Sequence, residues 1–141
     1  MTSFYPACFY KESVGYSVLF PDLSGLSAYG KNENDAYAKA TDTLAMHIFI
    51  TKKAGEKLPA PSAIKDISIK KTAKKFEIDA EPAYVTMVSV DADEYAKEHF
   101  ERTVRKTLTL PLWLYDAAVE QKINCSKVLA DALTAEVLKK R

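Results

Sequence analysis

Residues 102–111 read RTVRKTLTLP, and this short stretch decides what the C-terminal part of the chain can build. Between Val104 and Leu110 apolar and polar side chains alternate, a pattern typical of a half-buried β-strand. Pro111 ends the strand, because it has no N–H to donate, and it suits the first turn of a helix. The apolar face holds Val104, Leu108 and Leu110 together with Lys106, and the other face holds Arg105, Thr107 and Thr109.

A second copy of the chain is the simplest partner for this strand. One short strand followed by two small helices cannot bury its own apolar face. Two such strands would pair as an antiparallel ribbon that presents Arg105, Thr107 and Thr109 twice, a shape that fits the DNA major groove. The sequence therefore predicts a DNA-binding homodimer, and it leaves open whether dimers assemble into a tetramer.

The residues after Pro111 predict two helices. Leu114, Ala117 and Ala118 share one face of the first helix, and Asn124 is a good N-cap for the second. The first turn of a helix offers free backbone N–H groups and a positive dipole end, which favour an anion such as a phosphate. The stripe expected to be buried in the second helix consists of Leu129, Ala132, Leu133 and Val137.

This order of strand, proline, helix, capped turn and helix resembles the ribbon-helix-helix family of DNA-binding dimers. Two positions depart from the family's pattern: Lys106 stands at an inward position that is usually apolar, and Lys122 stands where a glycine often ends the first helix. The resemblance implies that the bases are read by Arg105, Thr107 and Thr109, and that the phosphates are held by Asn124, Cys125, Ser126 and Lys127.

Length and composition fit a folded protein of one or two small domains. The chain has 141 residues, of which 48% are hydrophobic, and no apolar run approaches the ~18 residues of a membrane span. The N-terminus lacks the charged and apolar regions of a signal peptide. Because Cys8 and Cys125 are the only cysteines, a disulfide framework is not expected, and we expect a cytoplasmic protein.

The net charge of +1 conceals an asymmetry between the two parts of the chain. Residues 1–101 hold 12 basic and 15 acidic side chains, net −3, whereas residues 102–141 hold 8 basic and 4 acidic ones, net +4. Nucleic-acid-binding proteins concentrate positive charge where they meet the polymer, so the split favours a DNA role for the C-terminal part. The alternative is an ordinary solvated helix that happens to end in basic residues.

The first 91 residues predict a small sheet with one long helix. Asn32 or Asn34 can cap that helix, which runs to about Lys53. Residues 63–82 give no clear pattern apart from a run of lysines. Strands are predicted over 4–10, 16–20, 26–29 and 83–90, followed by a short helical connector over about 92–100.

Three motifs in this part resemble the HicB antitoxin domain: GYSVLFPDLSGL over 15–26, PAPS over 59–62 and VTMVSVD over 85–91. The resemblance implies an α+β protein: an N-terminal partial RNase H-like β-β-β-α-β domain over 1–91, a helical connector over 92–101, and a C-terminal ribbon-helix-helix (β-α-α) dimerisation domain over 102–141. It also implies a HicA-type, mRNA-cleaving toxin as partner, whose active site the antitoxin occludes, and autorepression of the shared operon through operator DNA.

An enzymatic role is not expected. RNase H-like enzymes need several carboxylates around divalent metal ions, and Asp22 has no acidic partner at matching strand ends. His47 and His99 have no Cys or carboxylate at metal-ligand spacing, so neither a metal nor another cofactor is predicted. Tyr29 and Tyr37 are candidate surface aromatics for the toxin interface, with packing on the sheet as the alternative. Two other functions stay open: a stand-alone RNA-binding or RNase H-like protein, and a ribbon-helix-helix regulator with an N-terminal sensor domain.

Overall fold

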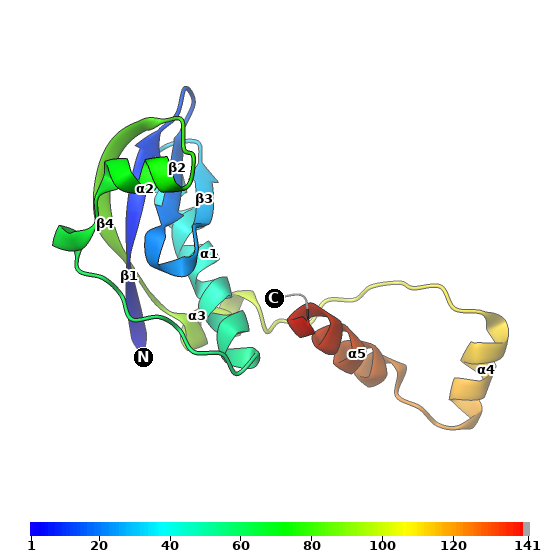
Figure 1. Cartoon of the computed structure of the whole chain (residues 1–141). Coiled ribbons are helices and arrows are strands. Elements are labelled where there is room, and N and C mark those ends of the chain that lie inside the picture. The colour runs from blue at the N-terminus through cyan, green and yellow to red at the C-terminus, as the bar shows by residue number, and fades with distance from the viewer. Residues whose placement is uncertain (140–141) are drawn as a thin grey trace. The chain divides into compact units, whose positions relative to one another are not determined.

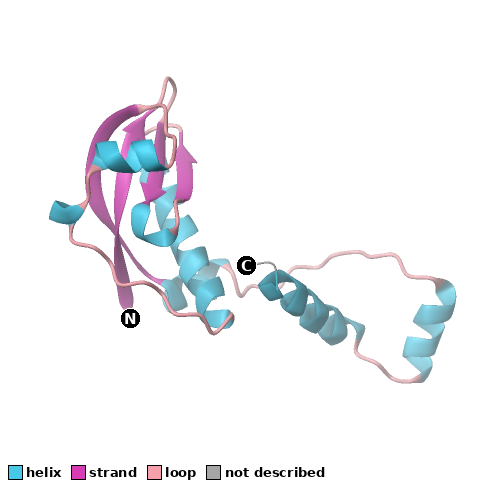
Figure 2. Ribbon diagram, in the orientation of Figure 1, coloured by secondary structure: helices cyan, strands magenta, loops and turns pink. Residues whose placement is uncertain are grey.

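The computed structural model describes residues 1–139 and divides into two compact units, Met1–Arg102 and Thr103–Arg141, which are described separately below (Figure 1). The first unit contains strands and helices, whereas the described part of the second unit contains helices and loops (Figure 2). The first unit consists of β1 (Thr2–Lys11), β2 (Tyr16–Phe20), β3 (Leu26–Gly30), α1 (Glu33–Lys53), α2 (Ile69–Lys75), β4 (Glu81–Asp91) and α3 (Ala92–His99), with short 3-10 turns at Pro21–Leu23 and Ile64–Asp66; the second contains α4 (Leu112–Glu120) and α5 (Cys125–Lys139).

The sheet is antiparallel throughout, with strand order β3-β2-β1-β4. β1 lies in its centre and pairs with β4 over its whole length, from Thr2 opposite Asp91 to Lys11 opposite Glu81. The prediction of a fourth strand over 83–90 is confirmed, and the strand is longer than expected because β1 offers a pairing partner over its full length. The chain is therefore a mixed α+β protein, as predicted from its sequence.

The main core lies between the sheet and α1. Alternate side chains of β1 (Tyr5, Ala7 and Phe9) point into this core together with Val18 and Phe20 of β2. The long helix begins where the Asn32 side chain accepts a hydrogen bond from the Asp35 N–H at 2.9 Å, so Asn32 rather than Asn34 is the cap. The apolar positions of α1 that lie in the core are Ala36, Ala40, Leu44, Ala45 and Ile48.

The opposite face of the sheet is covered in part by α2. The other alternate residues of β1, Cys8 and Tyr10, pack there with Leu19 against Ile69, Ala73 and Phe76. This helix was not predicted, because it has four lysines and only two apolar positions, Ile69 and Ala73, in seven residues. The Ser68 hydroxyl caps it by accepting the Lys71 N–H at 3.3 Å. Both faces of the sheet thus carry a helix, and the smaller cluster fixes the chain between α1 and β4.

The predicted connector is helical, as expected: α3 follows β4 directly, and its N-cap Asp91 accepts the Glu94 N–H at 3.2 Å. Ala92 and Ala96 are its buried residues. Within residues 1–139, no helix combines the length and the apolar character needed to cross a membrane.

Candidate functional site

Residues 103–111 form no strand in the single chain. The strand expected over 104–110 would pair with a second copy of the chain, so it stays a prediction. A strand exists through backbone hydrogen bonds to a neighbour, and among the described residues this segment pairs with none. All of its side chains are exposed, including the three predicted base readers Arg105, Thr107 and Thr109. The segment therefore presents both of its faces to solvent in one copy of the chain.

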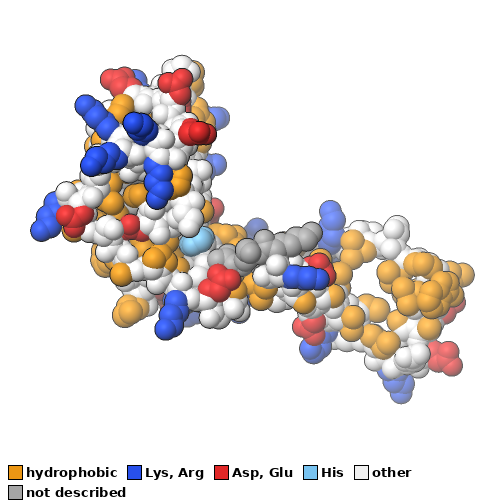
Figure 3. Space-filling view, viewed as in Figure 1, with side chains coloured by type: hydrophobic (Ala, Val, Ile, Leu, Met, Phe, Trp, Pro, Cys, Tyr) orange, Lys and Arg blue, Asp and Glu red, His pale blue; other side chains and the backbone are white. Residues whose placement is uncertain are grey.

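The stripes expected to be buried in the two following helices are not buried in one chain either. Neither α4 nor α5 contains a buried residue, and Leu133 and Val137 are 55% and 54% exposed. Figure 3 shows hydrophobic side chains gathered over this unit. Two short helices and an unpaired segment leave nothing to cover these faces, so the burial that the pattern predicts needs a second molecule.

The junction between α4 and α5 contains the lysine that departs from the ribbon-helix-helix pattern. Lys122 has a left-handed backbone with φ 55°, a conformation usually left to glycine. Its N–H donates to the Val119 carbonyl at 3.1 Å, and the Ile123 N–H donates to the Ala118 carbonyl at 2.9 Å. These two bonds close the end of α4 in the same way that a glycine would, so the departure in sequence leaves the turn between the helices intact.

The start of α5 brings together the four residues predicted to hold phosphates. The Asn124 side chain accepts the Lys127 N–H at 3.1 Å, which confirms Asn124 as the N-cap. The Lys127 ammonium lies 2.9 Å from the Asp131 carboxylate, one turn further along an exposed face. An exposed pair of this kind contributes little to stability, so Lys127 can exchange Asp131 for another anion. Cys125 and Ser126 are exposed beside them.

In the N-terminal unit, the Asp22 carboxylate has a structural role. Asp22 accepts the Ser62 N–H at 2.7 Å and the Ser62 hydroxyl at 2.8 Å, and Tyr5 donates to the Pro59 carbonyl at 2.6 Å. These bonds tie the PAPS segment to the sheet. Among the described residues no three His, Cys, Asp or Glu side chains gather as a metal site would require. The His99 ring instead stacks on Tyr95, with 3.9 Å between ring centroids.

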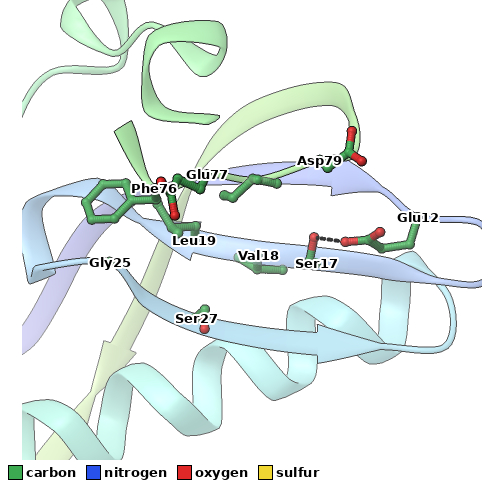
Figure 4. Close-up of a pocket in the computed structure, with 10 residues that line it drawn as sticks. Glu12, Ser17, Val18, Leu19, Gly25, Ser27, Phe76, Glu77 and Asp79 are labelled. Atoms are coloured by element: carbon green, nitrogen blue, oxygen red, sulfur yellow. Dashed lines mark hydrogen bonds between the residues drawn. The ribbon is translucent and has the colours of Figure 1, made fainter. Parts of the chain in front are cut away.

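A surface pocket of about 440 Å³ lies beside α2, over the part of the sheet that this helix leaves open (Figure 4). Three carboxylates line it, those of Glu12, Glu77 and Asp79, and the Ser17 hydroxyl donates to Glu12 at 2.7 Å. These side chains make the pocket an acidic surface.

Both tyrosines suggested for a partner surface are exposed, Tyr29 on β3 and Tyr37 on α1. The Tyr29 hydroxyl donates to the Val14 carbonyl, and the Tyr37 hydroxyl donates to the Met87 carbonyl at 3.4 Å. Two further tyrosines were not predicted from the sequence: Tyr16 and Tyr84 both donate to the Glu33 carboxylate, at 3.1 Å each. Tyr16, Glu33 and Tyr84 lie on three different elements and meet only in the folded unit, so no spacing in the sequence could have indicated this cluster.

The chain is similar to several solved structures. One chain of a toxin-antitoxin complex from Streptococcus pneumoniae is 28% identical, with a TM-score of 0.66, over 96% of this chain and 99% of that one. The Burkholderia pseudomallei antitoxin HicB is 20% identical, with a TM-score of 0.48, over 94% and 96% of the two chains. A HicB3 antitoxin is 25% identical, with a TM-score of 0.49, over 96% and 98%.

No curated protein sequence matches the chain. A family model described as the HicB-like antitoxin of bacterial toxin-antitoxin systems matches residues 5–132, which is most of the 141-residue chain and includes both units. The chain therefore belongs to the HicB-like antitoxin family.

Proposed function

We propose that this protein is an antitoxin with two activities. Residues 1–91 bind a HicA-type, mRNA-cleaving toxin and occlude its active site, with their sheet in a partial RNase H-like arrangement. Residues 102–141 form a ribbon-helix-helix dimer that binds operator DNA and represses the operon encoding both proteins. The observation that carries the proposal is the family match, which spans the folded N-terminal unit and the unit whose apolar faces stay uncovered in one chain.

Pairing of two copies is supported by the state of the C-terminal unit. Val104, Leu108 and Leu110 are 78%, 53% and 51% exposed, a run of apolar side chains that water disfavours. Pairing of two segments 103–111 would satisfy their free backbone groups and would cover these side chains together with the stripes of α4 and α5. The polar face of the ribbon would then carry Arg105, Thr107 and Thr109 from each copy.

Toxin binding by the N-terminal unit is supported by its relatives and by its charge. The chain aligns over nearly its whole length with a chain of the Streptococcus pneumoniae toxin-antitoxin complex. An RNA-cleaving toxin must hold phosphates with cationic groups. A net charge of −3 over residues 1–101 is complementary to such a surface and would speed association with it.

The proposal is tested by co-expressing the chain with the short open reading frame next to its gene. We expect the neighbour alone to arrest growth, the pair to grow normally, and the two proteins to co-purify as a stable complex. The control is the same neighbour with an unrelated ribbon-helix-helix protein, which should leave growth arrested. If the product of the neighbouring reading frame is harmless, or does not co-purify with this chain, the proposed toxin partner is wrong. The better-supported function would then be a ribbon-helix-helix regulator with an N-terminal sensor domain.

For the DNA activity, Arg105→Ala is expected to weaken operator binding by about 1–3 kcal/mol, roughly 5- to 150-fold, and to relax sequence specificity. The reason is that an arginine can form two hydrogen bonds with a guanine edge, which alanine cannot. Fluorescence anisotropy with operator and scrambled duplexes measures both effects. The matched control is Arg102→Ala, which removes the same charge beside the ribbon and should weaken binding to both duplexes equally. An Arg105→Ala protein with unchanged affinity and specificity would remove Arg105 from the reading set.

A further inference from the structure

Two tyrosine hydroxyls meet at one carboxylate near the hairpin end of the sheet. Tyr16, the first residue of β2, donates to Oε1 of Glu33, and Tyr84 of β4 donates to Oε2 of the same side chain, at 3.1 Å in both cases. Glu33 is the first residue of α1 and is exposed. The carboxylate is thus held by two donors from two strands, and its charge still faces solvent.

The tyrosine rings of this region rest on a buried phenylalanine. The Tyr84 ring stacks on Phe9 with 4.9 Å between centroids and 15° between planes, and Tyr37 lies 6.4 Å from Phe9 at 21°. Phe9 is completely buried, whereas Tyr37 and Tyr84 are 40% and 38% exposed. Rings stacked on a fixed core residue and held at their hydroxyls lose little conformational entropy when a partner covers them.

Negative charge gathers around these rings. Asp35 stands in the first turn of α1 beside Glu33, and Glu81 begins β4. The hydrogen bond to Glu33 raises the pKa of the Tyr16 hydroxyl, and the charge of Glu81 adds to this rise. Neither Glu33 nor Asp35 forms an ion pair with any cation among residues 1–139. The Lys11 ammonium lies 5.6 Å from the centroid of the Tyr16 ring.

We propose that Tyr16, Glu33, Tyr37 and Tyr84, here named the tyrosine-glutamate surface, dock against the cationic RNA-binding face of the toxin. The inference rests on the proposed function and assigns that function to one surface. The Glu33 carboxylate takes the place of an RNA phosphate, and the exposed rings take the place of its bases. Tyrosines are enriched among the residues that dominate binding energy in protein interfaces, and a carboxylate without an ion-pair partner is complementary to an arginine or lysine that holds phosphate.

Charge disfavours two other partners for this surface, a nucleic acid and a second copy of the chain. A nucleic acid would bring phosphates against Glu33 and Asp35, and the lysines of α2 lie over the opposite face of the sheet, where Figure 3 shows blue side chains gathered. A second copy of the chain, paired here by two-fold symmetry, would place two copies of this acidic patch in one interface. A cationic protein partner would not be repelled by these carboxylates.

The test is the affinity of the full-length antitoxin for its purified toxin, measured by titration calorimetry. We expect Tyr37→Ala to weaken binding about 30-fold, as for a residue that dominates an interface, and Glu33→Gln to weaken it about 10-fold, as for a lost charged contact. Lys74→Ala, on the outer face of α2, is the matched control and should bind as tightly as the wild-type protein. Tyr37→Phe keeps the ring and should retain most of the affinity.

Thermal melting of each variant shows whether it remains folded, and Glu33→Gln, an exposed and nearly isosteric change, decides the question if Tyr37→Ala melts early. Wild-type affinity in both Glu33→Gln and Tyr37→Ala would overturn this inference while leaving the antitoxin role in place. A wild-type protein that binds no toxin would instead overturn the proposed function itself. If Tyr37→Ala changes the oligomeric state or nucleic-acid binding but not toxin affinity, the surface has a different occupant and the inference is wrong.

Discussion

Removal of residues 103–141 is expected to abolish operator binding and self-association completely while leaving the toxin-binding unit folded. All residues of the two hydrophobic clusters lie between Tyr5 and Phe100, so the truncated chain keeps its whole core. It loses every residue proposed to touch DNA and the apolar faces proposed to pair two copies. Light scattering at micromolar concentration should report a monomer, anisotropy should report no operator complex, and growth in the presence of the toxin should still be rescued.

Two outcomes of this truncation would revise the proposal. A truncated protein that stays dimeric would place the main self-association surface on the N-terminal sheet rather than on the ribbon. A folded, monomeric protein that no longer rescues growth would show that the C-terminal unit contributes to the toxin interface. The full-length Arg105→Ala protein is the control, because it should bind the operator more weakly but remain a dimer that neutralises the toxin.

The second large effect is expected from Gly30→Ala at the end of β3. A Cβ at this position would lie 2.1 Å from the Ala36 backbone nitrogen and 2.4 Å from its Cα, and a backbone contact of this kind cannot be relieved by turning a side chain. Either β3 or the start of α1 must move, and both belong to the main core. We expect a loss of roughly 3 kcal/mol or more of the free energy of unfolding, measured by urea denaturation.

Gly55→Ala is the matched control for this substitution. Gly55 follows α1 with φ +71°, and nothing lies within 4 Å of a Cβ added there. The change should cost about 1–2 kcal/mol for the left-handed backbone alone, without any clash. A Gly30→Ala protein as stable as Gly55→Ala would mean that the start of α1 can shift freely, and the position of Glu33 would then be less tightly fixed than we infer.

Several features of the fold could be predicted because they depend on neighbours in the chain. The caps at Asn32 and Asn124 are local hydrogen bonds to the third residue along, so residue type and spacing are enough to indicate them. The apolar spacing of α1 and the alternation of β4 likewise reflect which side of a single element is covered. Residues 63–82 were not predicted, because a two-turn helix with lysines on its outer side has too few apolar positions to show a period.

The sequence by itself determined the four strands, the long helix, the two C-terminal helices and the antitoxin family, because strand and helix periods and a glycine-proline turn pattern are properties of neighbouring residues. The tertiary structure alone decided that Tyr16, Glu33 and Tyr84 meet, since they are separated by 17 and 51 residues and only the pairing of β1 with both β2 and β4 brings them together. It also decided that residues 103–111 remain unpaired in one chain. A strand needs a partner, and alternation in a sequence shows which face would be covered but not which molecule covers it.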